Sequence, residues 1–99
     1  MHTLYHGTNN PHSVLDALVG GGKIRTGFHM SPTFNVAQNY GHTVIAITIT
    51  DDLTMSHVGL INKEGNSNKV TGGGIEYVLK DDAAVSELYA VLWDAMPVL

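Results

Sequence analysis

The stretch TVIAITIT, residues 43–50, decides the fold that this sequence predicts. Isoleucine occupies every second position from 45 to 49 and would line one face of an extended strand, while valine, alanine and threonine would line the other. A strand that is apolar on both faces is covered on both faces, so we expect it to be central in a sheet. Its apolar run is far too short to span a bilayer.

Shorter strands and helices are predicted on both sides of this central strand. Ser31 followed by Pro32 is typical of a helix start, and a glycine would end that helix directly after Tyr40. Residues 62–74 are rich in glycine and asparagine and predict a mobile surface loop of the kind that often borders a site. The other predicted elements are strands at residues 3–5, 27–30 and 75–80, a helix at residues 13–20, and a short strand or one helical turn at residues 55–61.

Residues 82–93 fit two patterns. Ala84, Leu88 and Val91 recur at helical spacing, whereas residues 86–93 can equally alternate as a strand. The pattern of apolar residues leaves both alternatives open.

Length and composition limit the classes of protein to which this chain can belong. The 99 residues, 43% of them hydrophobic, predict a single domain over residues 1–99 with one core. Nine acidic against five basic residues give a net charge of −4 without a basic cluster, which argues against a nucleic-acid partner. The N-terminal residues lack the pattern of a signal peptide, so we expect no membrane partner. The absence of cysteine excludes a thiolate nucleophile and favours a cytoplasmic setting.

The first segment with chemical potential is YHGT, residues 5–8. It places an imidazole, a backbone without a Cβ atom and a hydroxyl close together, and such a patch suits sugar hydroxyls and amides. Taken alone, the segment is equally typical of a surface histidine near a turn. The six histidines are scattered along the chain without metal-ligand spacing, so we predict no metal site.

Three further segments form a pattern together with YHGT. Taken one at a time, their residues are typical of ordinary structural positions. The segments are GFHMS at residues 27–31, AQNY at residues 37–40 and GIEYVLKD at residues 74–81. Together with YHGT, and in this order, they resemble the diphtheria-toxin and poly(ADP-ribose) polymerase branch of the ADP-ribosyltransferases, in which a His, a Tyr and a Glu act together. The resemblance covers most of the chain and aligns His6, Tyr40 and Glu76 with that triad.

This resemblance implies an α+β fold, the ADP-ribosyltransferase-like split antiparallel sheet. Two half-sheets would face each other with two short helices, and NAD would bind in the cleft between them. The resemblance also makes residues 86–93 a strand beside Glu76, and we favour that alternative for this segment.

The same resemblance gives roles in NAD cleavage to the triad and its neighbours. Tyr40 would stack on the nicotinamide ring, and the backbone of Gly7 would hydrogen-bond the carboxamide. His6 would donate a hydrogen bond to a ribose hydroxyl. Glu76 would accept from the 2′-hydroxyl of the nicotinamide ribose, and its charge would stabilise the oxocarbenium-like cation that forms as the glycosidic bond breaks.

Other NAD contacts follow from the resemblance, and two positions depart from it. Thr8 would support the sugar region, and Arg25, the only arginine, would approach the adenosine or the pyrophosphate. His29 stands where the branch commonly has a second tyrosine beside the nicotinamide, and Ala37 replaces a serine that often precedes the stacking tyrosine. We therefore expect the contacts around the nicotinamide to be rearranged.

The function implied is mono-ADP-ribosyl transfer from NAD, without a metal, to an acceptor that is a protein by the habit of the family. The setting would be the cytoplasm of the producing cell or of a target cell. One alternative is a catalytically silent module that binds NAD, ADP-ribose or a protein. Another is a transferase that acts on a small molecule such as an antibiotic. The related RNA 2′-phosphotransferases grip phosphate with several arginines, and this chain has Arg25 alone.

Overall fold

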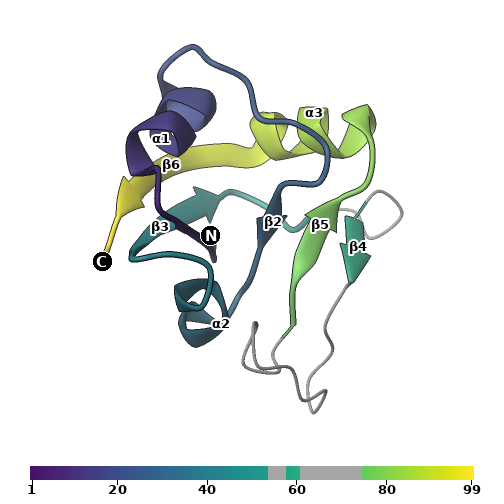
Figure 1. The fold of residues 1–99 in the computed structure, drawn as a ribbon. Coiled ribbons are helices and arrows are strands. Elements are labelled where there is room, and N and C mark those ends of the chain that lie inside the picture. Colours follow the sequence, from purple (N-terminus) through teal and green to yellow (C-terminus); the bar gives the residue numbers. More distant parts are fainter. Residues whose placement is uncertain (54–57, 61–74) are drawn as a thin grey trace.

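The computed structural model of the chain describes residues 1–53, 58–60 and 75–99. Within these residues it contains three short helices and six strands (Figure 1). In chain order the elements are β1 (His2–Thr8), α1 (Pro11–Val19), β2 (His29–Met30), α2 (Phe34–Gln38), β3 (Thr43–Ile49), β4 (Val58–Leu60), β5 (Tyr77–Leu79), α3 (Asp82–Val91) and β6 (Leu92–Pro97).

The strands form two antiparallel sheets. One has the order β1-β3-β6 and the other the order β2-β5-β4, with three strands in each. An isolated bridge between Tyr5 and Ser31 connects the first strand of one sheet to the segment that follows β2. Figure 1 shows the two sheets side by side, with α1 and α3 above them and α2 below. The predicted α+β class with antiparallel strands in two sheets is therefore confirmed, and the number of helices is three rather than two.

The central position predicted for residues 43–50 is confirmed. β3 lies between β1 and β6, and both Ile45 and Ile47 are fully buried. The smaller apolar residues Val44 and Ala46 on its other face are buried as well. α2 covers this face, because Ala37 lies against Gly7, the cross-strand partner of Val44, whereas α1 packs on the isoleucine face. An apolar strand with two covered faces is the expected centre of a small sheet.

The strand favoured for residues 86–93 is wrong, since most of this segment is helical. The carboxylate of Asp81 accepts a hydrogen bond from the backbone N–H of Ala84 at 2.9 Å and caps the start of α3. Helical spacing then brings Ala84, Val85 and Leu88 to one buried face. The strand comes later, as β6, and it pairs with β3 in the other sheet rather than with β5 beside Glu76.

The remaining predicted elements are present with shifted ends. α1 begins at Pro11 rather than at Ser13, because proline is well suited to the first turn of a helix. The predicted strands are β1, which is longer than expected, and β2 and β5, which are shorter. β4 lies within the segment for which a strand or a helical turn was open, and the predicted loop at residues 62–74 lies outside the described residues.

The helix predicted after Ser31 is shorter than expected. α2 runs from Phe34 to Gln38, with Thr33 as its N-cap, so that Tyr40 lies two residues beyond the helix rather than at its end. The hydroxyl of Ser31 is used in contacts outside the helix, which are described below.

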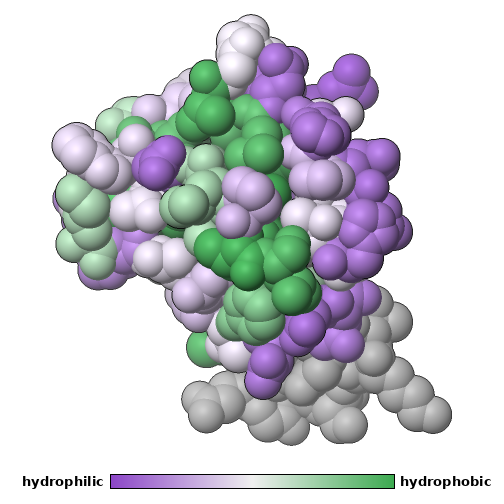
Figure 2. All heavy atoms as spheres, turned by 90° about the vertical axis from the view of Figure 1, so that its left-hand side faces the viewer, coloured by the Kyte–Doolittle hydropathy of each residue, from purple (hydrophilic) through white to green (hydrophobic). Residues whose placement is uncertain are grey.

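Apolar side chains form one main core and part of the surface. On the face shown in Figure 2, apolar residues gather in a central band that is bordered by polar ones. None of the described helices is long and apolar enough to cross a membrane. The exposed large apolar residues in the described part of the chain are Met1, Val19, Trp93, Met96, Val98 and Leu99.

Candidate functional site

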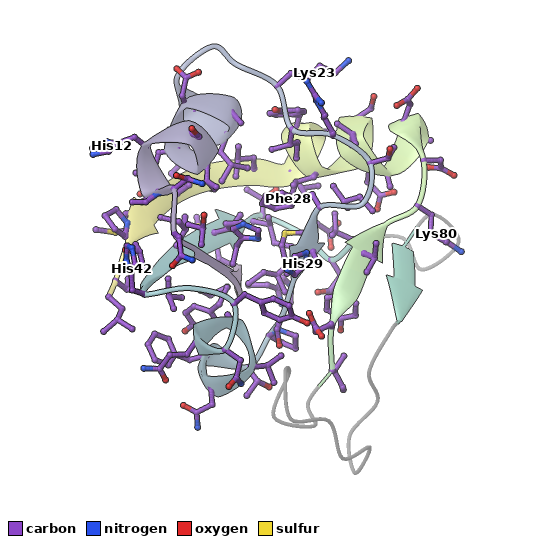
Figure 3. All side chains as sticks on the ribbon, viewed as in Figure 1. His12, Lys23, Phe28, His29, His42 and Lys80 are labelled. Atoms are coloured by element: carbon purple, nitrogen blue, oxygen red, sulfur yellow. The ribbon has the colours of Figure 1, made fainter. Side chains whose placement is uncertain are left out.

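Four side chains from distant parts of the chain meet in one cluster: His6, His29, Tyr40 and Glu76. The ring centroids of His6 and His29 are 5.3 Å apart, and those of His29 and Tyr40 are 4.4 Å apart. The Tyr40 hydroxyl donates a hydrogen bond to Glu76 Oε2 at 2.7 Å. Figure 3 shows His29 near the middle of the molecule, on β2, which is an edge strand of the second sheet. The fold thus brings the three residues of the predicted triad into a continuous set of contacts through His29.

The hydrogen bond of His6 fixes the tautomer of its ring. His6 Nδ1 lies 2.6 Å from the backbone oxygen of His29, and a carbonyl oxygen can only accept, so Nδ1 carries the hydrogen. Nε2 of the neutral ring is then an acceptor. The ring also stacks on Phe28, with centroids 4.2 Å apart and an interplanar angle of 16°.

Burial favours the neutral form of His6. The residue is 8% exposed, and desolvation lowers the pKa of its imidazole, while the bond to the His29 backbone opposes this and the nearby His29 side chain adds to it. With its hydrogen on Nδ1, the neutral ring can accept a hydrogen bond through Nε2 but has no second N–H to donate.

The bond between Tyr40 and Glu76 joins a phenol to a buried carboxylate. Glu76 is 1% exposed and lies directly before β5. Burial, the hydrogen bond to Glu76 and the charge of that carboxylate all raise the pKa of the Tyr40 phenol, so Tyr40 keeps its proton and remains the donor. Hydrogen bonds of this charge-assisted kind are among the stronger ones in proteins.

Two glycines let the segment around Tyr40 lie directly on β1. A Cβ atom built on Gly7 would overlap the carbonyl oxygen of Ala37 and would lie 3.2 Å from Cβ of Tyr40. A Cβ atom on Gly41 would overlap the backbone of Thr8. The position of Tyr40 is therefore set by backbone contacts on both sides, and Ala37, one of the two departures from the family pattern, lies in this contact.

The backbone groups of Gly7 face away from β3. Tyr5 exchanges both of its backbone hydrogen bonds with Ser31, at 2.7 and 2.8 Å, on the side of β1 opposite to β3. In an antiparallel pair, residues two positions apart direct their N–H and C=O groups to the same side, so those of Gly7 point the same way as those of Tyr5. This is the side on which β2 lies.

The other two predicted NAD contacts lie apart from the cluster. Thr8 is buried, and its hydroxyl accepts a hydrogen bond from the backbone of Asn10 at 2.9 Å, at the turn into α1. Arg25 is exposed in the segment between α1 and β2 and makes no hydrogen bond or ion pair with the cluster among the described residues. It lines a surface depression together with Lys23, Ile24, Thr26 and Asp82.

A second depression is lined by Leu4, Ile49, Asp52, Leu53 and Tyr77. Neither of these two depressions is lined by His6, Tyr40 or Glu76.

Sequence reasoning missed two residues at the site, Phe28 and Ser31. The ring of Phe28 stacks on the ring of His6. No local sequence pattern indicates this pairing, because it depends on how the two sheets meet. Ser31 was expected to cap a helix, yet its hydroxyl donates to the backbone oxygen of Ile75, a residue 44 positions away. A serine that precedes a proline gives no signal for such a distant contact.

One nitrogen of the cluster is buried without a hydrogen-bond partner among the described residues. It is Nε2 of His29. No group of three or more His, Cys, Asp or Glu side chains in the described part of the chain is arranged to hold a metal ion.

Comparison of the chain with protein-family models, with curated proteins and with solved structures finds no match.

Proposed function

We propose that this protein is an NAD-dependent mono-ADP-ribosyltransferase in which Glu76 is the catalytic carboxylate. The observation that carries the proposal is the hydrogen bond between Tyr40 and the buried Glu76, with the His6 and His29 rings in contact beside it. A buried carboxylate costs free energy unless it is held by donors, and such groups are common where charge develops in a reaction.

The cluster has the chemistry that cleavage of NAD requires. The bond between C1′ of the ribose and the nicotinamide nitrogen breaks, and its electron pair leaves with the nicotinamide. The negative charge of Glu76 stabilises the cation that develops on the ribose, and the acceptor then forms the new bond to C1′ and loses its proton. A charge that acts on the transition state more than on bound NAD raises the rate rather than the affinity.

The surrounding groups would hold the nicotinamide and the ribose on the two sides of the bond that breaks. The Tyr40 ring supplies a stacking face, and the backbone of Gly7 supplies a donor and an acceptor for the carboxamide. His6 accepts from a ribose hydroxyl through Nε2. Entry of the nicotinamide beside Tyr40 requires the His29 and Tyr40 rings to separate, because their centroids are 4.4 Å apart.

The test is release of nicotinamide from NAD by the wild type and by Glu76→Gln, which keeps the size of the side chain and removes its charge. We expect the wild type to release nicotinamide and the variant to bind NAD while its turnover falls about 100-fold or more. The matched control is Glu87→Gln on α3, which should behave as the wild type. Saturable NAD binding without release would instead support a binding module, and absence of NAD binding would end the proposal.

A protein acceptor is the second part of the proposal, and it rests on the family resemblance. Incubation with labelled NAD and a cell lysate, followed by mass spectrometry, should find ADP-ribose on protein side chains in the wild-type sample and not in the Glu76→Gln sample. Label on small molecules alone would favour the antibiotic-type alternative.

A further inference from the structure

Ser31 is buried, at 1% exposure, and it touches the three segments that carry the predicted triad. Its backbone exchanges two hydrogen bonds with Tyr5, the residue directly before His6. This bridge is the connection that fixes β1 beside the segment following β2. Because Tyr5 directly precedes His6, this bridge also holds the backbone of His6 close to Ser31.

The hydroxyl of Ser31 holds the second segment. It donates to the backbone oxygen of Ile75 at 2.6 Å, and Ile75 is the residue directly before Glu76. This bond ties the start of the β5 segment to β2 at a point just outside the ladder, where the β2–β5 pairing stops at Met30 and Tyr77. Glu76 is therefore held twice, through its neighbour by Ser31 and through its carboxylate by Tyr40.

The same hydroxyl oxygen holds the third segment. It accepts a hydrogen bond from the backbone N–H of Thr33 at 3.0 Å, and Thr33 is the N-cap of α2. A serine hydroxyl has one hydrogen to donate and lone pairs to accept, so a single oxygen serves both contacts. α2 then leads to Tyr40, and this segment is seated on Gly7 through the backbone of Ala37 and the Cβ atom of Tyr40.

We infer that Ser31 is a positioning residue for the proposed reaction, one that sets the distances among His6, Tyr40 and Glu76 without touching the substrate. The inference rests on the proposed function. Loss of the hydroxyl leaves the Tyr5 bridge in place and frees the segment of Glu76 from β2. A displacement of about 1 Å between reacting groups can lower a rate about 100-fold, whereas ground-state contacts elsewhere on NAD are retained.

The experiment measures kcat and KM for nicotinamide release by Ser31→Ala at a temperature where the variant is fully folded. We expect kcat to fall about 10- to 100-fold while KM changes less than about threefold. Ser31→Thr keeps the hydroxyl and should recover most of the lost kcat even though its added methyl group lowers stability. The matched control is Thr50→Val, which removes another hydroxyl-to-carbonyl bond, from Thr50 to Val91 at 3.3 Å, and should leave kcat unchanged.

The outcomes separate this inference from the proposed function. Absence of nicotinamide release from the wild type overturns the proposed function itself. Release by the wild type with an unchanged kcat in Ser31→Ala, or an equal loss of kcat in the Ala and Thr variants, overturns the role of Ser31 alone. If Ser31→Ala does not fold, Ser31→Cys, a near-isosteric side chain with a much weaker donor, takes its place with the same expected fall in kcat and the same overturning result.

Discussion

At the scale of single residues, the direction of one hydrogen bond decides what His6 can do. Its Nδ1 donates to the backbone of His29, so its free nitrogen accepts while the ring is neutral. Protonation would turn that nitrogen into a donor and would place a charge in a buried position next to a second imidazole. The proposed contact, in which Nε2 accepts from a sugar hydroxyl, therefore requires the neutral form of His6, whereas donation to the sugar would require the protonated form.

A pH dependence of stability follows from this residue. The pKa of His6 in the folded protein lies below the value of 6.5 of an unperturbed histidine, so the unfolded chain binds the proton more readily. The free energy of unfolding contributed by His6 is then complete at high pH and falls as the pH drops below about 6.5 towards the folded pKa. His6→Asn keeps a donor for the His29 carbonyl and removes the titration.

Urea unfolding of the wild type and of His6→Asn between pH 7.5 and 5 measures this effect. The difference in free energy of unfolding should shift in favour of the variant as the pH falls. His12→Asn, an exposed substitution on α1, serves as the control and should run parallel to the wild type. Parallel curves for the wild type and His6→Asn would contradict the prediction.

At the scale of helices and strands, α3 shows where local pattern was sufficient and where it was not. Its helical spacing was visible in the sequence, and its cap at Asp81 lies directly before it. The resemblance, however, favoured a strand for the same residues. The helix forms because the cap and a buried face at Ala84, Val85 and Leu88 support each other.

The cap of α3 gives a prediction at this scale. Asp81→Ala removes the acceptor of the Ala84 N–H and should lower the free energy of unfolding by about 0.5–2 kcal/mol. Asp81→Asn keeps a capping oxygen and should lose much less. Denaturant unfolding of the two variants checks this, and equal losses for both would show that the cap contributes nothing beyond the charge.

Other elements show the same division between local pattern and tertiary contacts. β3 was predictable because residues 43–50 are apolar on both faces of an extended strand. A strand with two apolar faces is expected at the centre of a sheet, and β3 lies there. The meeting of His29 with Tyr40 was not predictable from either segment. It depends on how the end of α2 sits on β1, which is set by the close approach of Ala37 to Gly7.

At the scale of the whole molecule, the two sheets and three helices are joined by a few polar contacts across the core. Tyr89 of α3 makes one of them, because its hydroxyl accepts from the backbone N–H of Ile24 at 2.8 Å and donates to the carbonyl of Ala17 at 2.5 Å. This single oxygen connects α1 and the segment after it to α3. The α1 region and the α3 region are expected to unfold together for this reason.

Tyr89→Phe tests that connection. The change leaves two backbone groups without their partner and should lower the free energy of unfolding by about 1–3 kcal/mol. Tyr77→Phe, in another half-buried tyrosine that packs against the core, is the matched control with a smaller expected loss. Chemical denaturation followed by circular dichroism measures both variants. A loss in Tyr89→Phe no larger than in the control would show that the hydroxyl does not join these regions.

The close seating of the Tyr40 segment on β1 has a consequence for how this protein tolerates change. Gly7 and Gly41 flank that segment, and neither has room for even one methyl group. Gly21 and Gly27, by contrast, have positive φ angles of 97° and 88° and open space around them. In a library that samples every amino acid at these positions, the first two should accept almost no replacement, whereas the second two should accept asparagine, which adopts such φ angles more readily than most residues.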